Sequence, residues 1–313
     1  MSNDFKKYLV IGTGALGGFY GAKLAKSGLD VHFLVHSESD YKFIKTHGLK
    51  VKSRYGDIYL NAINCYNNPD NMPKGDVILV AIKAFSNNVL KNILPPVIKD
   101  SSIIVLLQNG IGGEEYITDL IDNTRIFGGL SILAVSKDGP GLINHHDFGS
   151  IKIGQYNPDS NPREVSLQLN EIVDDFEKAG IFASAVPDLM KARWEKLIWN
   201  IPFSGLSVLL DADTKQIISN PNSLELAGEI IKDVAMAAEA CGKTISPDFQ
   251  QKMIDITVTM TPYFPSMKLD FDSGKPMEVE AIFGNPLRLA RKAGYNAPYI
   301  SMLYHLLKVL QKR

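Results

Sequence analysis

The sequence lacks the features of secreted, zinc-knuckle and membrane proteins. It has 2 cysteines among 313 residues, Cys65 and Cys241, far apart and without CxxC spacing, a pattern that disfavours a disulfide framework or a zinc knuckle. No apolar run reaches the roughly 18 residues that span a bilayer. The start MSNDFKKYLV leads into a predicted strand without the apolar core of a signal peptide. We therefore expect a cytoplasmic protein without membrane contact.

Charge of one sign is also missing. The 33 basic and 34 acidic residues nearly cancel, so the chain offers no general attraction for nucleic acid, and any anion site has to be local. With 45% hydrophobic residues, a chain of this length can bury a full core in two domains or in one large domain.

What is present in the first half is an alternation of helical stretches with short apolar runs. These runs, typical of parallel strands buried on both faces, are 8–12, 31–35, 76–82, 102–108 and 125–133. Glycines and alternating polarity at 139–156 predict an antiparallel pair at the sheet edge. A helix at 162–179 and a last strand at 181–186 are expected to follow.

The second half shows only helical periodicity, punctuated by proline and glycine. Asn220-Pro221 and Ser246-Pro247 predict helix starts, and no convincing strand follows Pro187. We therefore predict an α/β fold with a doubly wound, mostly parallel sheet in a dinucleotide-binding domain at 1–186, followed by an all-helical substrate and catalytic domain at 187–313.

A glycine-rich turn follows the first predicted strand directly. It consists of Gly12, Thr13, Gly14, Ala15, Leu16 and Gly17. In this pattern the first glycine permits the sharp bend, the second leaves room for a pyrophosphate, and the third lets the helix pack closely on the strand. Free N–H groups at the helix N-terminus then meet the phosphates. Because βαβ spacing surrounds the turn, we predict that it binds a dinucleotide; the alternative is a tight turn without a ligand.

The end of the second predicted strand decides which dinucleotide is preferred. An acidic residue there binds the ribose 2′-OH of NAD, whereas a basic residue binds the 2′-phosphate of NADP. The chain reads Val35-His36-Ser37-Glu38. His36 and Ser37 could donate to a phosphate, while Glu38 keeps NAD open, and a solvated loop is the alternative interpretation of His36.

Polar residues also follow the next two strands, where ligands bind to doubly wound sheets. Lys83 follows the strand at 76–82, and Asn109 follows the strand at 102–108. We expect both side chains near the nicotinamide. The alternatives are a surface lysine and a plain Asn-Gly turn.

One helical face of the second half carries three polar residues at i, i+4 and i+8: Lys196, Asn200 and Ser204. Apolar neighbours such as Trp194 predict that Lys196 is partly desolvated, which would lower its pKa and suit it for proton transfer. A solvated polar stripe is the alternative. Pro202 removes a helical N–H, so we expect a kink there.

Several further polar residues have simpler structural explanations. Glu278 could stabilise the start of a helix at 278–293, and Ser266 could be an N-cap. His145-His146-Asp147 does not predict a metal site, because adjacent strand residues point to opposite faces. No GxSxG motif indicates a serine hydrolase.

Together these residues resemble the 2-dehydropantoate 2-reductase, or ketopantoate reductase, family. The likeness spans nearly the whole chain and rests on motifs in a fixed order: GTGALG, AIKAF, QNGIGG, SILAVSKDG, FGSIKIG, WEKLIWN, and PSM followed by Glu278 in EVEAIFG. The resemblance implies a Rossmann-type domain, a small 2-oxo acid as substrate, and reduction of 2-dehydropantoate to (R)-pantoate with NADPH for pantothenate and coenzyme A biosynthesis.

The resemblance also implies a role for each matching residue. Lys196 would be the catalytic acid that protonates the ketone oxygen as hydride arrives. The other implied contacts are Asn200 and Ser266 with substrate, Asn109 with substrate and cofactor, Lys83 and Ala134 with cofactor, and Glu278 with cofactor or substrate hydroxyls.

Three positions depart from the family pattern. Ser204 replaces a second substrate-binding asparagine, Pro202 is foreign to the helix, and His36 replaces an arginine that would hold the 2′-phosphate. NAD therefore stays open beside NADP. A reductase of another 2-oxo or 3-oxo acid, and a dinucleotide-binding sensor without turnover, are the alternative functions. A homodimer is compatible with the sequence.

Overall fold

The computed structural model describes residues 6–311, and the chain divides into two compact units. Unit 1 consists of Met1–Gln108 and Gly113–Leu189, and unit 2 of Asn109–Gly112 and Met190–Arg313. The four residues Asn109–Gly112, called the NGIG loop below, therefore group with unit 2 although they interrupt unit 1.

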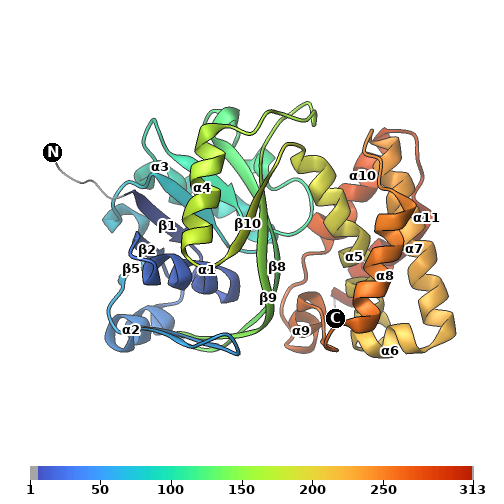
Figure 1. Ribbon diagram of the computed structural model, residues 1–313, viewed down its shortest axis with the longest axis horizontal. Coiled ribbons are helices and arrows are strands. Elements are labelled where there is room, and N and C mark those ends of the chain that lie inside the picture. The colour runs from blue at the N-terminus through green and yellow to red at the C-terminus, as the bar shows by residue number, and fades with distance from the viewer. Residues whose placement is uncertain (1–5, 312–313) are drawn as a thin grey trace. The chain divides into compact units, whose positions relative to one another are not determined.

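Unit 1 is built on a ten-stranded, mostly parallel sheet in the described part of the chain (Figure 1). Its parallel core has the order β7-β6-β1-β2-β5. The bounds are β1 (Lys7–Ile11), β2 (Asp30–Leu34), β5 (Asn64–Tyr66), β6 (Val77–Val80) and β7 (Ile103–Leu106). The residues of β6 and β7 are all buried, as expected for strands covered on both faces. This confirms the predicted doubly wound sheet.

The long antiparallel hairpin corrects one expectation. The antiparallel pair predicted within 139–156 is instead one strand, β9 (Leu142–Gln155), which pairs with β8 (Ile126–Gly139), and β9 is not the sheet edge. It also pairs with β3 (Leu49–Ser53) and with β10 (Phe182–Val186), and β3 pairs with β4 (Ile58–Leu60) at that end of the sheet. Strand β3 alternates lysines with apolar residues and β4 has only three residues, so both carried too weak an apolar signal to be predicted as strands.

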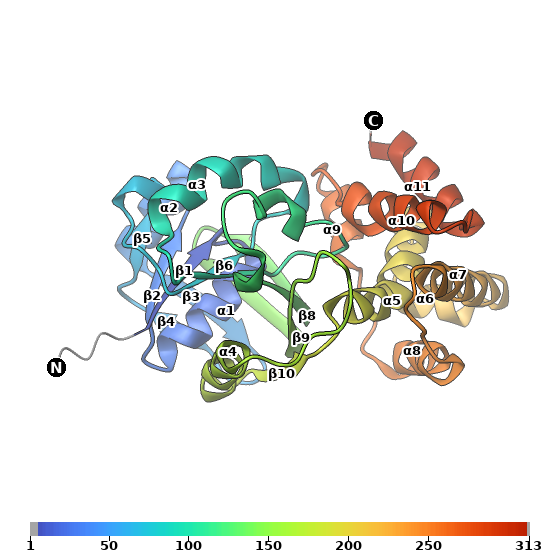
Figure 2. The same ribbon diagram turned by 90° about the horizontal axis from the view of Figure 1, so that it is seen from above.

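Helices cover the two faces of this sheet. In Figure 2, α1 (Ala15–Lys26) and α4 (Leu167–Lys178) lie on one side and α3 (Leu90–Val97) on the other. The remaining helices are α2 (Glu38–His47) and the short 3₁₀ turns η1 (Pro69–Asn71), η2 (Ala84–Val89), η3 (Glu114–Ile117) and η4 (Asn123–Arg125). Helix α4 begins five residues later than predicted, where the Ser166 side chain accepts from the N–H of Leu169.

All regular secondary structure in the described residues of unit 2 is helical, as predicted. Its elements are α5 (Leu189–Leu210), α6 (Thr214–Ser219), α7 (Pro221–Ala240), α8 (Pro247–Thr259), α9 (Ser266–Asp272), η5 (Glu280–Gly284), α10 (Asn285–Lys292) and α11 (Pro298–Gln311). Asn220 and Ser246 are N-caps of α7 and α8, and α5 continues through Pro202. Among the described helices, none is long and apolar enough to cross a membrane.

Two helix starts in unit 2 differ from the expectation. The region after Glu278 is not a simple α-helix: a π-helical turn, η5, precedes α10, so Glu278 lies before these elements. Ser266 is the first residue of α9, and Pro265 holds the N-cap position. Pro265 holds that position with φ −54°, close to the value that its ring imposes, so Ser266 falls inside the first turn and no side chain caps α9.

Candidate active site

The glycine turn of unit 1 has the geometry of a phosphate cradle. Gly12 has φ +98°, and a Cβ there would lie 2.8 Å from Ile82. A Cβ on Gly17 would lie 2.1 Å from the backbone oxygen of Gly12. Gly14, by contrast, is the N-cap of α1, and a Cβ there would meet nothing within 4 Å. Two glycines therefore close the turn, and the third opens space over the helix end.

The first turn of α1 supplies the donors for an anion in that space. Ala15 and Leu16 begin the helix, and no side chain caps their end of it. The Thr13 hydroxyl points instead into the protein and donates to the carbonyl of Leu34 at 3.1 Å. These residues fit the pyrophosphate of a dinucleotide, because the N–H groups and the positive end of the helix dipole face open space.

The end of β2 holds the residues expected to read the ribose. His36 is exposed. Ser37 caps α2 by accepting from the N–H of Asp40, and Glu38 accepts from Asn67 Nδ2 at 2.9 Å. Together with Lys42, this hydrogen bond holds the pKa of Glu38 below its usual range. Glu38 is thus an exposed but paired carboxylate on the first turn of α2, whereas His36 is the first exposed side chain after β2.

The remaining unit 1 candidates lie on two different elements. Lys83 is partly buried after β6, and Ala134 lies in β8 opposite Asp147, next to a break in strand register. The side chains of Asn87 in η2 and Gln108, which follows β7, bond each other in both directions. This buried amide pair was missed, because only the tertiary structure brings the two residues together.

In unit 2 the structure brings three predicted residues together. Lys196 Nζ donates to Asn109 Oδ1 at 2.8 Å, and Asn109 Nδ2 lies 3.4 Å from Glu278 Oε2. The three side chains come from α5, from the NGIG loop and from the segment before η5. An ammonium, an amide and a carboxylate thus form one chain of hydrogen bonds.

Lys196 has the altered acidity that a proton donor needs. Burial and, to a smaller extent, the positive charge of Arg193 lower its pKa, the negative charge of Glu278 opposes both, and the resulting pKa is about 8. Desolvation is the largest cause, because removal from water disfavours the charged ammonium. At neutral pH the ammonium form still predominates, and its proton is easier to transfer than that of a solvated lysine.

The other predicted substrate residues differ in accessibility. Asn200, one turn beyond Lys196 on α5, is partly buried. Ser204 is only 5% exposed, whereas Ser266 at the start of α9 is exposed. Next to Ser266, the buried Lys268 bonds Asp211 at 2.7 Å, which ties α9 to the end of α5.

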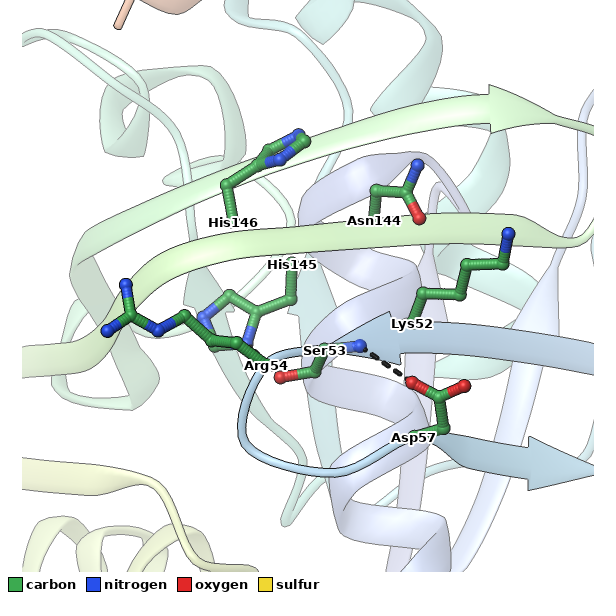
Figure 3. A pocket seen from close by; sticks show the side chains of 7 residues that line it. All are labelled: Lys52, Ser53, Arg54, Asp57, Asn144, His145 and His146. Carbon is green, nitrogen blue, oxygen red and sulfur yellow. Dashed lines mark hydrogen bonds between the residues drawn. The ribbon is translucent and has the colours of Figure 1, made fainter. Parts of the chain in front are cut away.

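A separate hollow of about 360 Å³ lies on unit 1 (Figure 3). Its lining comes from the β3–β4 hairpin and from β9: Lys52, Ser53, Arg54, Asp57, Asn144, His145 and His146. His145 Nε2 donates to the carbonyl of Phe148, and its Nδ1 accepts from the Ser53 hydroxyl at 2.9 Å. Burial lowers the pKa of His145, which favours the neutral ring. This histidine holds strands together.

Within the described residues, no group of three or more histidine, cysteine or acidic side chains could hold a metal ion.

The chain matches known proteins over nearly its whole length. The family model "Ketopantoate reductase PanE/ApbA" matches residues 8–158, and "Ketopantoate reductase PanE/ApbA C terminal" matches residues 188–311. The 2-dehydropantoate 2-reductase of Nostoc sp. (strain PCC 7120) is 44% identical over 308 residues, which cover 98% of this chain and 96% of that protein.

Solved structures agree with these matches. The crystal structure of 2-dehydropantoate 2-reductase from Geobacter metallireducens GS-15 has a TM-score of 0.92 and 36% identity, covering 96% of this chain and 99% of that one. A D-mandelate dehydrogenase with NADH and anilino(oxo)acetate shares the fold, with a TM-score of 0.88 at 20% identity and 98% coverage of both chains. By these matches, the chain belongs to the ketopantoate reductase family.

Proposed function

We propose that this protein reduces 2-dehydropantoate to pantoate with NADPH. The observation that carries the proposal is the hydrogen bond between Lys196 and Asn109, with Glu278 beyond it, in a chain 44% identical to a protein named 2-dehydropantoate 2-reductase. A partly desolvated ammonium is the group that reduction of a ketone requires, because negative charge develops on the carbonyl oxygen.

The dinucleotide supplies the hydride, and the chain supplies the proton and the alignment. Lys196 donates a hydrogen bond to the ketone oxygen, stabilises the developing charge and transfers its proton to that oxygen. Asn109 Oδ1 accepts one N–H of the same ammonium and so directs another toward the substrate. Glu278 holds the Asn109 amide in the orientation that keeps its oxygen toward the lysine.

The remaining roles extend this proposal to the substrate and to the cofactor. Asn200 and Ser266 bind polar groups of the substrate, and Ser204 shapes the same helix face from a buried position. For the cofactor, the glycine turn binds the pyrophosphate, and His36 approaches the ribose phosphate. Lys83 and Ala134 complete the cofactor contacts. We further propose that residues 1–186 and 187–313 act as the dinucleotide-binding and the catalytic domain.

Turnover by purified protein tests the proposal. We expect NADPH to be oxidised with 2-dehydropantoate, and Lys196→Ala to lower kcat by about 10²- to 10⁴-fold, the usual contribution of a positioned acid. Lys191→Ala, an exposed lysine on the same helix, is the matched control and keeps its activity. Absence of turnover with either NADPH or NADH, or full activity of Lys196→Ala, would overturn the proposal.

A second candidate is a reductase of another small 2-oxo or 3-oxo acid. The observation that favours it is Ser204, whose short, buried side chain reaches less far than an asparagine would. A panel of keto acids compared by kcat/KM separates the two reductases. A protein that binds dinucleotide without turnover would show cofactor affinity but no consumption with any acid of the panel.

A further inference from the structure

The NGIG loop is bonded to unit 2 at three points. Arg193 Nη1 donates to the carbonyl of Gly110 at 2.8 Å, and Asn285 Nδ2 donates to the carbonyl of Ile111 at 2.6 Å. The N–H of Ile111 donates to the carbonyl of Ala281 at 3.0 Å. Hydrogen bonds with residues of α5, η5 and α10 therefore anchor the four-residue NGIG loop.

The Ala281 carbonyl is available because of the chemistry of the π-helical turn. In η5 the N–H of Asn285 donates to the carbonyl of Glu280, five residues back. The next bond of this pattern would need the N–H of Pro286, and proline has none. The carbonyl of Ala281 thus has no π-helical partner at that position, and the loop supplies one.

The two glycines of the loop allow this close seating. Gly110 has φ +83°, and a Cβ there would lie 2.1 Å from the carbonyl oxygen of Ala281. Gly112 has φ +94°, and a Cβ added there would lie 2.6 Å from the side-chain amide nitrogen, Nδ2, of Asn285. Between them, the Ile111 side chain is buried in the core of unit 2. Any side chain at either glycine would push the loop off its anchors.

We infer that these three bonds form a latch that positions Asn109 against Lys196 for proton transfer. Its positioning residues are Arg193, Asn285 and Pro286; Pro286 acts by leaving the Ala281 carbonyl to the loop. The inference rests on the proposed function, because it assigns these residues to the reaction through Asn109. A loop free to move by about 1 Å would misalign the lysine, and such shifts cost up to about 100-fold in rate.

Arg193 has a second effect, on the acidity of Lys196. The charged groups that act on this lysine are Arg193, one turn earlier on α5, and Glu278, bonded to Asn109. The positive charge of Arg193 favours the neutral amine of Lys196. Without this charge, the negative charge of Glu278 acts unopposed and the pKa of Lys196 rises. The latch thus connects loop position with proton-donor strength.

Hydrogen exchange at the Ile111 amide tests the latch without any assay of activity. We expect Asn285→Leu and Pro286→Ala to speed this exchange by about 2- to 10-fold, the range for one hydrogen bond lost. Alanine at 286 brings back an N–H that competes for the Ala281 carbonyl. Arg291→Gln, an exposed arginine on α10, is the control and leaves the exchange unchanged.

Kinetics test the positioning role. With 2-dehydropantoate we expect both variants to lower kcat by about 10- to 100-fold, with a smaller change in KM, while Arg291→Gln keeps the wild-type kcat. Faster exchange at Ile111 with an unchanged kcat would overturn the positioning role, and unchanged exchange in both variants would overturn the latch itself.

Two arginine variants separate position from charge. The pKa of Lys196 is measured by the pH dependence of its acetylation, followed by mass spectrometry, which requires no turnover. Arg193→Met raises this pKa, whereas Arg193→Lys keeps the charge and holds it near the wild-type value while kcat still falls. Equal pKa values in both variants and the wild type contradict the second effect. If the wild type reduces no keto acid, the proposed function fails, and the exchange and acetylation results still decide whether the latch exists.

Discussion

As the proposed acid, Lys196 acts only while it is protonated, so we expect its pKa of about 8 to set the pH range of the reaction. Below pH 8 the ammonium predominates and kcat is constant; above pH 8 we expect kcat for reduction to fall about tenfold per pH unit. The measurement is kcat against pH with saturating NADPH and substrate. A profile that stays flat up to pH 10 would contradict this assignment.

Glu278 provides the opposite electrostatic effect on the same lysine. Its negative charge raises the pKa of Lys196, so Glu278→Gln should lower that pKa and move the decline in kcat to lower pH. Saturating NADPH keeps cofactor affinity out of the comparison. If the decline in kcat moves to higher pH, or does not move, the carboxylate of Glu278 does not act on Lys196 by its charge.

His36 is the first exposed residue after β2, where we propose that the cofactor ribose binds. An aspartate there repels a 2′-phosphate and accepts from a 2′-OH. We expect His36→Asp to lower the ratio of kcat/KM for NADPH to that for NADH by at least about tenfold, equal to ~1.4 kcal/mol. His47→Asp, at the far end of α2, is the control, and an unchanged ratio in His36→Asp would place the ribose contact elsewhere.

At the scale of elements, the β1–α1 turn separates stability from binding. In Gly17→Ala the new Cβ meets the backbone oxygen of Gly12 at 2.1 Å, and we expect the free energy of unfolding to fall by about 1–3 kcal/mol, as for other overpacked sites. In Gly14→Ala the Cβ enters open space, so stability changes little while the Kd for NADPH rises at least about tenfold.

Chemical denaturation and fluorescence titration of NADPH measure the two quantities. A Gly14→Ala variant that binds NADPH like the wild type would show that the open space over α1 does not hold the pyrophosphate.

For the whole molecule, cofactor binding should appear as thermal stabilisation. NADPH at 100 times its Kd stabilises the folded state by ~2.7 kcal/mol. This raises Tm by roughly 5–10 °C for a domain of the size of the proposed dinucleotide-binding domain. Scanning calorimetry measures the shift, and Gly14→Ala at the same NADPH concentration should lose most of it. An equal shift in this variant would argue that NADPH binds away from the turn.

The sequence by itself determined the features that depend on local pattern. Buried strands read as apolar runs, the glycine turn follows the first strand directly, and the caps at Asn220 and Ser246 mark helix starts, because each signal lies within a few residues. The polar face of α5 with Lys196 was predictable for the same reason. The family motifs, in their order along the chain, pointed to the same residues.

Only the tertiary structure decided what depends on residues far apart in the chain. The apolar signal of β3 and β4 was too weak to read, and their place beside β9 follows from strand pairing. The NGIG loop groups with unit 2 because of bonds to Arg193 and Asn285 that span 83 and 174 positions. No local pattern predicts that the Ala281 carbonyl, which lacks a π-helical donor because of Pro286, accepts from Ile111 instead. The partner of such a carbonyl depends on which segments the fold brings together.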